Sequence, residues 1–141
     1  KVLARGAELS LDKTWDWGAR LRSSFGIQSA EQQGSSLQNS PQYLGKLNVS
    51  IPVPLMAGLR AGFELQYYGK RKTNDSTHTD SYFLSNLNLV TDVRWVKGLE
   101  ASLSFYNLFN EHYQHPAADT NWQNSLSQPG RTVRLRMDYR F

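Results

Sequence analysis

The sequence ends in Arg131-Thr132-Val133-Arg134-Leu135-Arg136-Met137-Asp138-Tyr139-Arg140-Phe141, a stretch in which apolar and polar side chains alternate strictly. Side chains along a β-strand point alternately to its two faces, so the stretch is predicted to be a strand with one apolar and one charged face. A soluble protein would bury the apolar face in a core, whereas a membrane barrel would turn it to lipid. The apolar face carries Val133, Leu135, Met137, Tyr139 and Phe141.

The same two-residue period recurs along the whole chain, which predicts an all-β protein of about seven antiparallel strands in an up-and-down meander. Several segments exceed ten residues. Strands of soluble proteins usually have about five or six residues, whereas tilted membrane strands need about 9–11. Strand length therefore favours a transmembrane β-barrel. Besides the C-terminal strand, the segments lie at about 3–12, 15–28, 41–53, 55–70, 81–96 and 98–109.

The predicted connections alternate between tight turns and long polar loops. Outer-membrane barrels have short turns at the periplasmic side and longer extracellular loops, and a soluble Greek-key sandwich does not need this alternation. The strand pattern falters only at 106–109, which indicates a bulge. The tight turns are expected at 12–14, 52–54 and 96–98, and the long loops at about 29–40, 71–80 and 112–129.

Aromatic side chains on the apolar faces gather near both ends of the strands. Amphipathic rings settle at the boundary between membrane and water, so two girdles are predicted. In a soluble protein the same rings would fill a core, but a core does not require their separation to the two ends. Trp15, Trp17, Trp95, Tyr139 and Phe141 lie near the tight turns, and Phe25, Tyr43, Tyr67 and Phe83 lie near the long loops.

Composition narrows the classes of function. The chain of 141 residues has no cysteine, which excludes disulfides and thiolate metal sites, and no run approaches the roughly 18 apolar residues of a membrane helix. The formal net charge is +4, but the cations are spread singly along the strands, so no nucleic-acid partner is expected. Lys70-Arg71-Lys72 is the one basic cluster in the sequence. Charges on the polar faces are predicted to be solvated, paired or in contact with other parts of a barrel.

The loops contain the remaining candidates for chemistry. Glu111, His112 and His115 do not have the spacing of common helix-borne zinc motifs, so no metal site is predicted. Loops of such scaffolds often carry binding residues. Tyr113, His115 and Trp122 are therefore possible contacts of an extracellular ligand.

A nucleophilic triad can be written from the loop residues Ser127, His112 and Asp119. No surrounding motif supports it, and polar loops supply such triplets by chance. We expect neither an enzyme nor a cofactor.

An odd number of strands predicts a fragment. Backbone groups left unpaired in hydrocarbon each cost several kcal/mol, and bacterial single-chain barrels close with even strand numbers. The first segment looks clipped, and the chain starts at Lys1 without an initiating Met or a leader. We therefore expect residues 1–141 to be the C-terminal part of a larger barrel.

Two C-terminal motifs and the terminal strand carry a family resemblance. Asn107-Leu108-Phe109-Asn110-Glu111-His112-Tyr113, followed by Pro129-Gly130-Arg131-Thr132 and a strand ending in Phe141, resembles the C-terminus of TonB-dependent outer-membrane receptors. Arg5-Gly6-Ala7-Glu8-Leu9-Ser10-Leu11 is similar to a barrel strand of that family. The resemblance covers essentially the whole chain.

The resemblance implies part of a 22-stranded barrel in the outer membrane of a Gram-negative bacterium. The plug, through which TonB would act, and the earlier strands would lie upstream of these residues. Such receptors take up scarce nutrients, most often ferric siderophores. The implied partners are outer-membrane lipid and the barrel-assembly machinery, which would read Val133, Leu135, Met137, Tyr139 and Phe141 as its signal.

Two other functions remain open at this stage. A passive porin or channel would have the same strands but no plug. A soluble β-sandwich binding module would bury the apolar faces and place Trp95 in its core.

Overall fold

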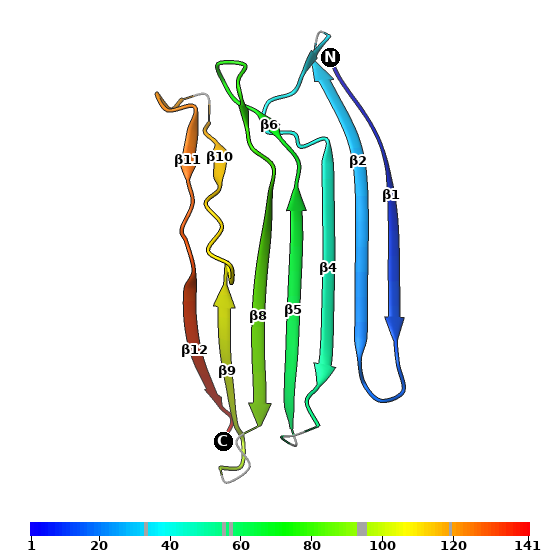
Figure 1. The fold of residues 1–141 in the computed structure, drawn as a ribbon, viewed down its shortest axis with the longest axis vertical. Helices are drawn as coiled ribbons and strands as arrows, with labels where there is room; N and C mark the ends of the chain where they lie inside the picture. Colours follow the sequence, from blue (N-terminus) through cyan, green and yellow to red (C-terminus); the bar gives the residue numbers. More distant parts are fainter. Residues whose placement is uncertain (33, 55, 57, 93–95, 119) are drawn as a thin grey trace.

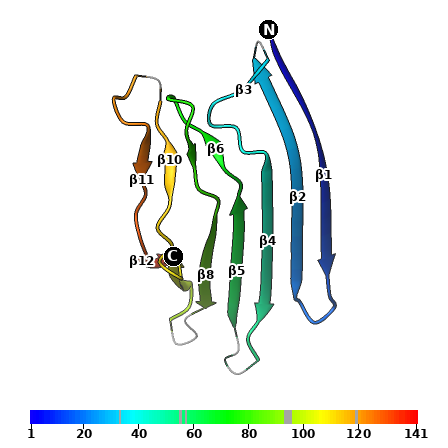
Figure 2. The same cartoon turned by 45° about the horizontal axis from the view of Figure 1, so that its top comes forward.

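A computed structural model describes residues 1–141 except 33, 55, 57, 93–95 and 119. The described residues form an all-β structure, and no helix among them is long and apolar enough to span a membrane. Seven long antiparallel strands form one sheet in the order β1-β2-β4-β5-β8-β9-β12, as Figures 1 and 2 show. The predicted meander is confirmed. Its strands are β1 (Val2–Thr14), β2 (Arg20–Gln32), β4 (Tyr43–Pro52), β5 (Leu59–Tyr68), β8 (Tyr82–Asp92), β9 (Leu99–Tyr106) and β12 (Thr132–Tyr139).

The first strand is longer than predicted. β1 has 13 residues, as many as β2, and includes the 12–14 segment that was expected to turn. The turn instead lies at 15–18, where Gly18 adopts a φ of 90° that favours glycine and its N–H donates to Trp15 O. The second connection, predicted at 52–54, lies between Pro52 of β4 and Leu59 of β5 and includes residues that are not described. The third lies between β8 and β9 and includes residues that are not described.

The long connections are more regular than expected. Each carries short strands instead of only irregular loop: β3 (Ser35–Ser36) pairs with β2, β6 (Arg71–Lys72) with β7 (His78–Thr79), and β10 (Gln114–Pro116) with β11 (Ser125–Ser127). We call the end of the sheet with these short strands the loop end. The opposite end, with the short connections, is the turn end (Figure 1).

The strand register places apolar side chains side by side across the sheet. One row of directly paired positions crosses six strands and is wholly apolar. A neighbouring row is wholly polar and occupies the other face, because adjacent residues of a strand point in opposite directions. The apolar row is Leu21–Val49–Phe63–Leu87–Phe105–Val133, and the polar row is Asp12–Arg22–Asn48–Glu64–Asn86.

No second layer covers the apolar face. Among the described residues only three hydrophobic side chains are buried, Ala19, Tyr82 and Ala117, and none belongs to the apolar rows. Leu9 and Leu135 are 77% and 64% exposed although each is central to its strand. A β-sandwich would bury these positions. Trp95, which a soluble β-sandwich would place in its core, lies outside the described residues.

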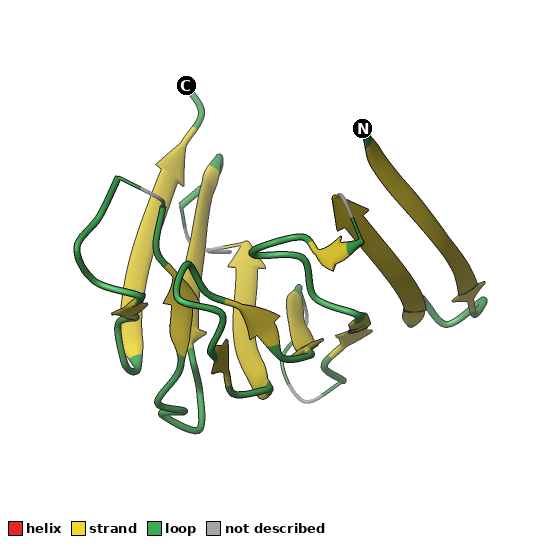
Figure 3. Ribbon diagram, turned by 90° about the horizontal axis from the view of Figure 1, so that it is seen from above, coloured by secondary structure: helices red, strands yellow, loops and turns green. Residues whose placement is uncertain are grey.

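The sheet is curved, as the view along its strands shows (Figure 3). The hollows along the strands are lined mainly by residues of the polar rows, such as Arg22, Glu64 and Asn88. We therefore call the polar face the inner face and the apolar face the outer face. This is the arrangement of a barrel wall with a wet interior and a lipid-facing exterior.

Tyr43, Tyr67 and Phe83 lie at or next to the loop-end termini of their strands, whereas Phe25 lies near the middle of β2. Phe25 and Tyr43 stack with ring centroids 6.4 Å apart, and the rings of Tyr67 and Phe83 are 4.8 Å apart on the next two strands. Gly45 lies between Phe25 and Tyr67 in the cross-strand row and leaves room for both rings. At the turn end, Trp15 and Trp17 lie 6.5 Å apart and Tyr139 and Phe141 6.2 Å apart. Their role at a membrane boundary stays a prediction.

An arginine introduced into β4 is predicted to destabilise the fold on the outer face and to be tolerated on the inner face. Leu47→Arg, on the outer face between Ser23 and Leu65, should lower the free energy of unfolding by about 2–4 kcal/mol if it faces the bilayer midplane. Asn48→Arg, on the inner face between Arg22 and Glu64, should change it by less than about 1 kcal/mol. Folding titrations of the full-length protein in lipid vesicles measure both. Equal costs would contradict the assignment of the faces.

Candidate functional site

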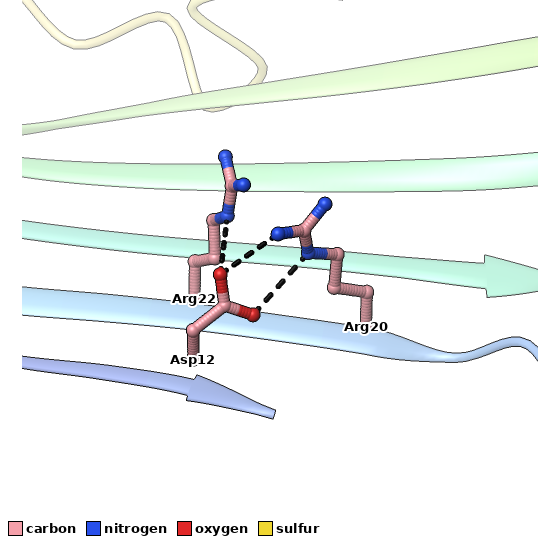
Figure 4. A network of polar contacts seen from close by, with 3 residues as sticks. All are labelled: Asp12, Arg20 and Arg22. Atoms are coloured by element: carbon pink, nitrogen blue, oxygen red, sulfur yellow. Dashed lines mark hydrogen bonds and ion pairs between the residues drawn. The ribbon is translucent and has the colours of Figure 1, made fainter. Parts of the chain in front are cut away.

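Charged side chains of the inner face pair with one another near the turn end. Asp12 of β1 accepts hydrogen bonds from two arginines of β2 (Figure 4): Arg20 Nη2 and Arg22 Nε each lie 2.8 Å from Asp12 Oδ2. All three side chains are about half exposed, so solvent screens the pairs and they contribute little stability. Their effect is to fix the direction of two guanidinium groups.

The polar network continues across the inner face. Glu64 accepts a hydrogen bond from Asn86 Nδ2 at 2.9 Å, and Ser104 donates to Asn88 Oδ1 at 2.8 Å. These side chains, with Arg20 and Arg22, line an open hollow of about 500 Å³. The inner face is therefore polar and hydrogen-bonded across several neighbouring strands.

Arg71 joins the three long connections at the loop end. Its side chain is 7% exposed and donates to Asn39 Oδ1 at 3.2 Å, Tyr82 Oη at 3.2 Å and the Gln114 carbonyl at 3.1 Å. Its guanidinium also lies 5.8 Å from the ring centroids of Tyr68 and Tyr82. No ion pair to it occurs among the described residues, so neutral acceptors and aromatic faces stabilise the buried charge.

Two predicted ligand contacts, Tyr113 and His115, pack against this arginine cluster. The Tyr113 and Tyr82 rings are 4.5 Å apart. Because the Tyr82 hydroxyl oxygen accepts from Arg71, its O–H is free to donate to His115 Nε2, 3.1 Å away. Burial, and then the charge of Arg71, lower the pKa of His115, and burial raises the pKa of Tyr113. Both side chains are half-buried and help to hold the loops together.

Trp122, the third predicted ligand contact, is 91% exposed on the last long connection. The structure thus separates it from Tyr113 and His115, and ligand binding by the three residues stays a prediction. Among the described residues no three acidic or histidine side chains gather as metal ligands. Asp119, named in the triad considered above, lies outside the described residues.

The Asn107–Asn110 segment explains the bulge expected after β9. Phe105 pairs with Leu87, so Leu108 would lie opposite Leu84, yet its N–H donates to Ser85 O at 2.7 Å. One extra residue has therefore entered this strand, as in a β-bulge. Asn107 and Asn110 adopt φ of 51° and 57°, a region that asparagine tolerates better than most residues.

The two asparagines also bind the ends of the last connection. Asn107 is 3% exposed, and its side chain accepts from Glu111 N at 2.8 Å and donates to Glu111 O at 2.9 Å. Asn110 Oδ1 accepts from Arg131 N at 2.9 Å. A Cβ on Gly130 would lie 2.6 Å from that same oxygen, so any larger residue there would force the Asn110 side chain to shift. The two motifs that carried the family resemblance thus meet at one turn.

Because of this contact, the effects of Gly130→Ala and Asn110→Ala on the free energy of unfolding are predicted to be non-additive. Gly130→Ala alone should lower the free energy of unfolding by about 1–3 kcal/mol, because the added methyl displaces Asn110 Oδ1. Gly26→Ala is the control, since its nearest contact would be Ala7 O at 3.9 Å. A double-mutant cycle in vesicle-folded, full-length protein measures the coupling. Strictly additive costs would show that the contact does not hold the turn.

The 73–77 turn is held by a carboxylate. Asp75 Oδ1 accepts from the Thr77 N–H at 3.0 Å and from the hydroxyls of Thr73 and Thr77 at 2.6 and 2.7 Å. These hydrogen bonds, that from Thr73 first, lower the pKa of Asp75 from 3.8 to about 2. Asn124 and Asn74 then tie this turn to the last connection through Asp75 Oδ2 and Ala118 O.

Acid should loosen this turn. The folded-state pKa of Asp75 lies below its unfolded value, so its stabilising effect is full above pH 3.8 and is lost as pH falls through about 2. We expect the backbone amides of residues 73–77 to be less protected from hydrogen exchange at pH 2 than at pH 4, after correction with an unfolded peptide of the same sequence. Asp75→Asn should remove most of this difference. An unchanged pH dependence in that variant would assign the loosening to another group.

Comparison with known proteins adds a structural neighbour. No family model matches the sequence, and no curated protein matches it either. The solved structure of the FpvAI–pyocin S2 complex aligns with 98% of this chain at a TM-score of 0.78 and 16% sequence identity. The fold is that of a barrel segment of FpvAI. The chain spans about a fifth of the matched chain, since the alignment covers 20% of it.

Proposed function

We propose that this chain forms part of the barrel wall of an outer-membrane receptor for TonB-dependent uptake of a scarce nutrient, with a ferric siderophore as the expected ligand. One observation carries the proposal: the sheet is a single layer with wholly apolar rows on its exposed outer face and hydrogen-bonded charges on its inner face. That distribution suits lipid on one side and an aqueous interior on the other.

The fold comparison supports the receptor class. FpvAI is a TonB-dependent receptor, and the matched structure contains it in complex with pyocin S2. The C-terminal motifs of this chain point independently to the same family, and Asn107, Asn110 and Gly130 give those motifs a structural role. Both lines of support concern the barrel wall. Coupling to TonB, the ligand and the outer-membrane location therefore belong to the proposal.

Within this proposal, β12 acts as the assembly signal. Its outer-facing residues are among the most exposed of the chain: Val133, Leu135, Met137 and Tyr139 are 58–64% exposed and Phe141 fully so. β12 also pairs with only one neighbour, β9, among the described strands. An exposed apolar face beside an open strand edge suits recognition by the barrel-assembly machinery. The proposal assigns no catalytic step to the chain.

The alternatives predict different behaviour. A passive channel would share this wall, and only energy dependence separates it from a receptor. A soluble β-sandwich is disfavoured because the described sheet has no partner layer over rows such as Leu89–Leu103–Leu135.

Uptake by the full-length protein tests the proposal. It should sit in the outer membrane, and deletion of its gene should reduce iron-limited growth on the siderophore that it accepts. Deleting tonB in the host should abolish that uptake while leaving the amount of protein in the outer membrane unchanged. Uptake of equal rate with and without TonB would establish the passive channel instead. A protein found in the soluble fraction would overturn both membrane functions.

A further inference from the structure

A second hollow lies at the loop end, between the end of β2, residues 36–42 and the β6–β7 hairpin. Figure 2 shows β3 and β6 at this same end of the sheet. The hollow has a volume of about 410 Å³, within the range of small-ligand sites. Lys70, Lys72 and His78 line it together with hydroxyl and amide side chains. Its polar lining includes Gln28, Ser36, Ser40 and Gln42.

The hairpin register explains why these basic residues share one hollow. Lys72 pairs directly with His78, so their side chains leave the hairpin on one face, while the pair Arg71 and Thr79 occupies the other face. The Arg71 side chain binds within the buried cluster described above, whereas Lys72 lines the hollow. Lys70 also lines it, so two of the three consecutive cations in the sequence converge there.

The charge of this hollow differs from that of the inner face at the turn end. Arg20 and Arg22 share the carboxylate of Asp12, whereas no carboxylate is among the described residues that line the loop-end hollow. Neither lysine forms an ion pair within the described part of the chain. Lys72 Nζ donates instead to the neutral Ser35 Oγ at 2.9 Å. Two ammonium groups in one hollow attract an anion and repel each other without one.

The hairpin that carries the two lysines and the opposite wall of the hollow are held by hydrogen bonds. Asn39 N donates to Lys72 O at 3.0 Å, and Arg71 fixes the same hairpin from its other face. Gln28 Nε2 donates to Pro41 O at 2.8 Å and anchors the opposite wall. Fixed donors lose less conformational entropy on binding, which favours affinity.

The position of Gln28 indicates on which face of the sheet the hollow lies. Gln28 belongs to the same alternating series of β2 as Arg20 and Arg22, so it lies on the inner face. The hollow therefore opens toward the aqueous side of the sheet and not toward the outer, lipid-contacting face. This orientation favours a soluble ligand over a lipid headgroup.

We propose that this hollow is a subsite for a soluble oxyanion, a carboxylate- or phosphate-bearing group, held by Lys70, Lys72 and His78. It deepens the proposed function, on which it rests, by assigning anionic groups to the ligand. Ammonium groups bind such oxygens through charge-assisted hydrogen bonds, and the surrounding hydroxyls and amides supply further donors.

Calorimetric titration of the purified full-length protein with citrate and with pyrophosphate tests the subsite. We expect both anions to bind in a neutral detergent, and Lys70→Gln/Lys72→Gln to weaken binding by about tenfold or more. Lys97→Gln removes a charge at the turn end and should leave affinity unchanged. Ser35→Ala breaks the contact to Lys72 but keeps both charges, so it should change affinity by less than about threefold.

Three results would overturn the subsite. The first is no binding of either anion by the unaltered protein. The second is equal binding by the double lysine variant. The third is displacement of citrate by lipid A in mixed micelles, which would identify a lipid phosphate as the natural occupant. TonB-dependent uptake that persists beside any of these results leaves the proposed function intact, so the two ideas fail separately.

Discussion

Backbone pairing between neighbouring strands is the constraint on which everything else in this structure depends. A sheet one layer thick has no core behind it, so its ladder of hydrogen bonds must fix which side chains face which side. A slip of one residue would move the row from Leu21 to Val133 to the inner face and the row from Asp12 to Asn86 to the outer face. The extra residue near Asn107 is tolerated because it comes where β9 leaves the long sheet, beyond the last apolar pair of Phe105.

The inner face changes character between its two ends. Near the turn end, Asp12 pairs with two guanidinium groups and balances one of their two charges, and Arg136 pairs with Asp138 on β12. At the loop end, a buried guanidinium rests on neutral acceptors and two lysines border a hollow without a described carboxylate. The two ends thus differ in local arrangement: charges of both signs meet at the turn end, whereas the described lining of the loop-end hollow is basic. Such a lining attracts anions locally.

The sequence predicts the strands and their faces well because a period of two is a local property. Turn positions are predicted less well: 12–14 continues β1, since the Trp15–Gly18 hydrogen bond and not strand polarity decides where the chain reverses. The role of Arg71 could not be predicted, because its partners Asn39, Tyr82 and Gln114 are distant in sequence. The basic cluster Lys70-Arg71-Lys72 is evident in the sequence, but which of its side chains lie on which face of the hairpin depends on the pairing with β7.

The sharing of Arg71 among three connections has a consequence for evolution. Loops of a barrel are usually free to diverge one at a time, since each is tied only to its own pair of strands. Here a change in one connection that removes Asn39 or shifts Gln114 would leave a buried cation without its acceptors. The three connections therefore form one inherited unit. Homologues are expected to change the three connections together, and grafting a single loop from one relative to another is expected to give a poorly ordered surface.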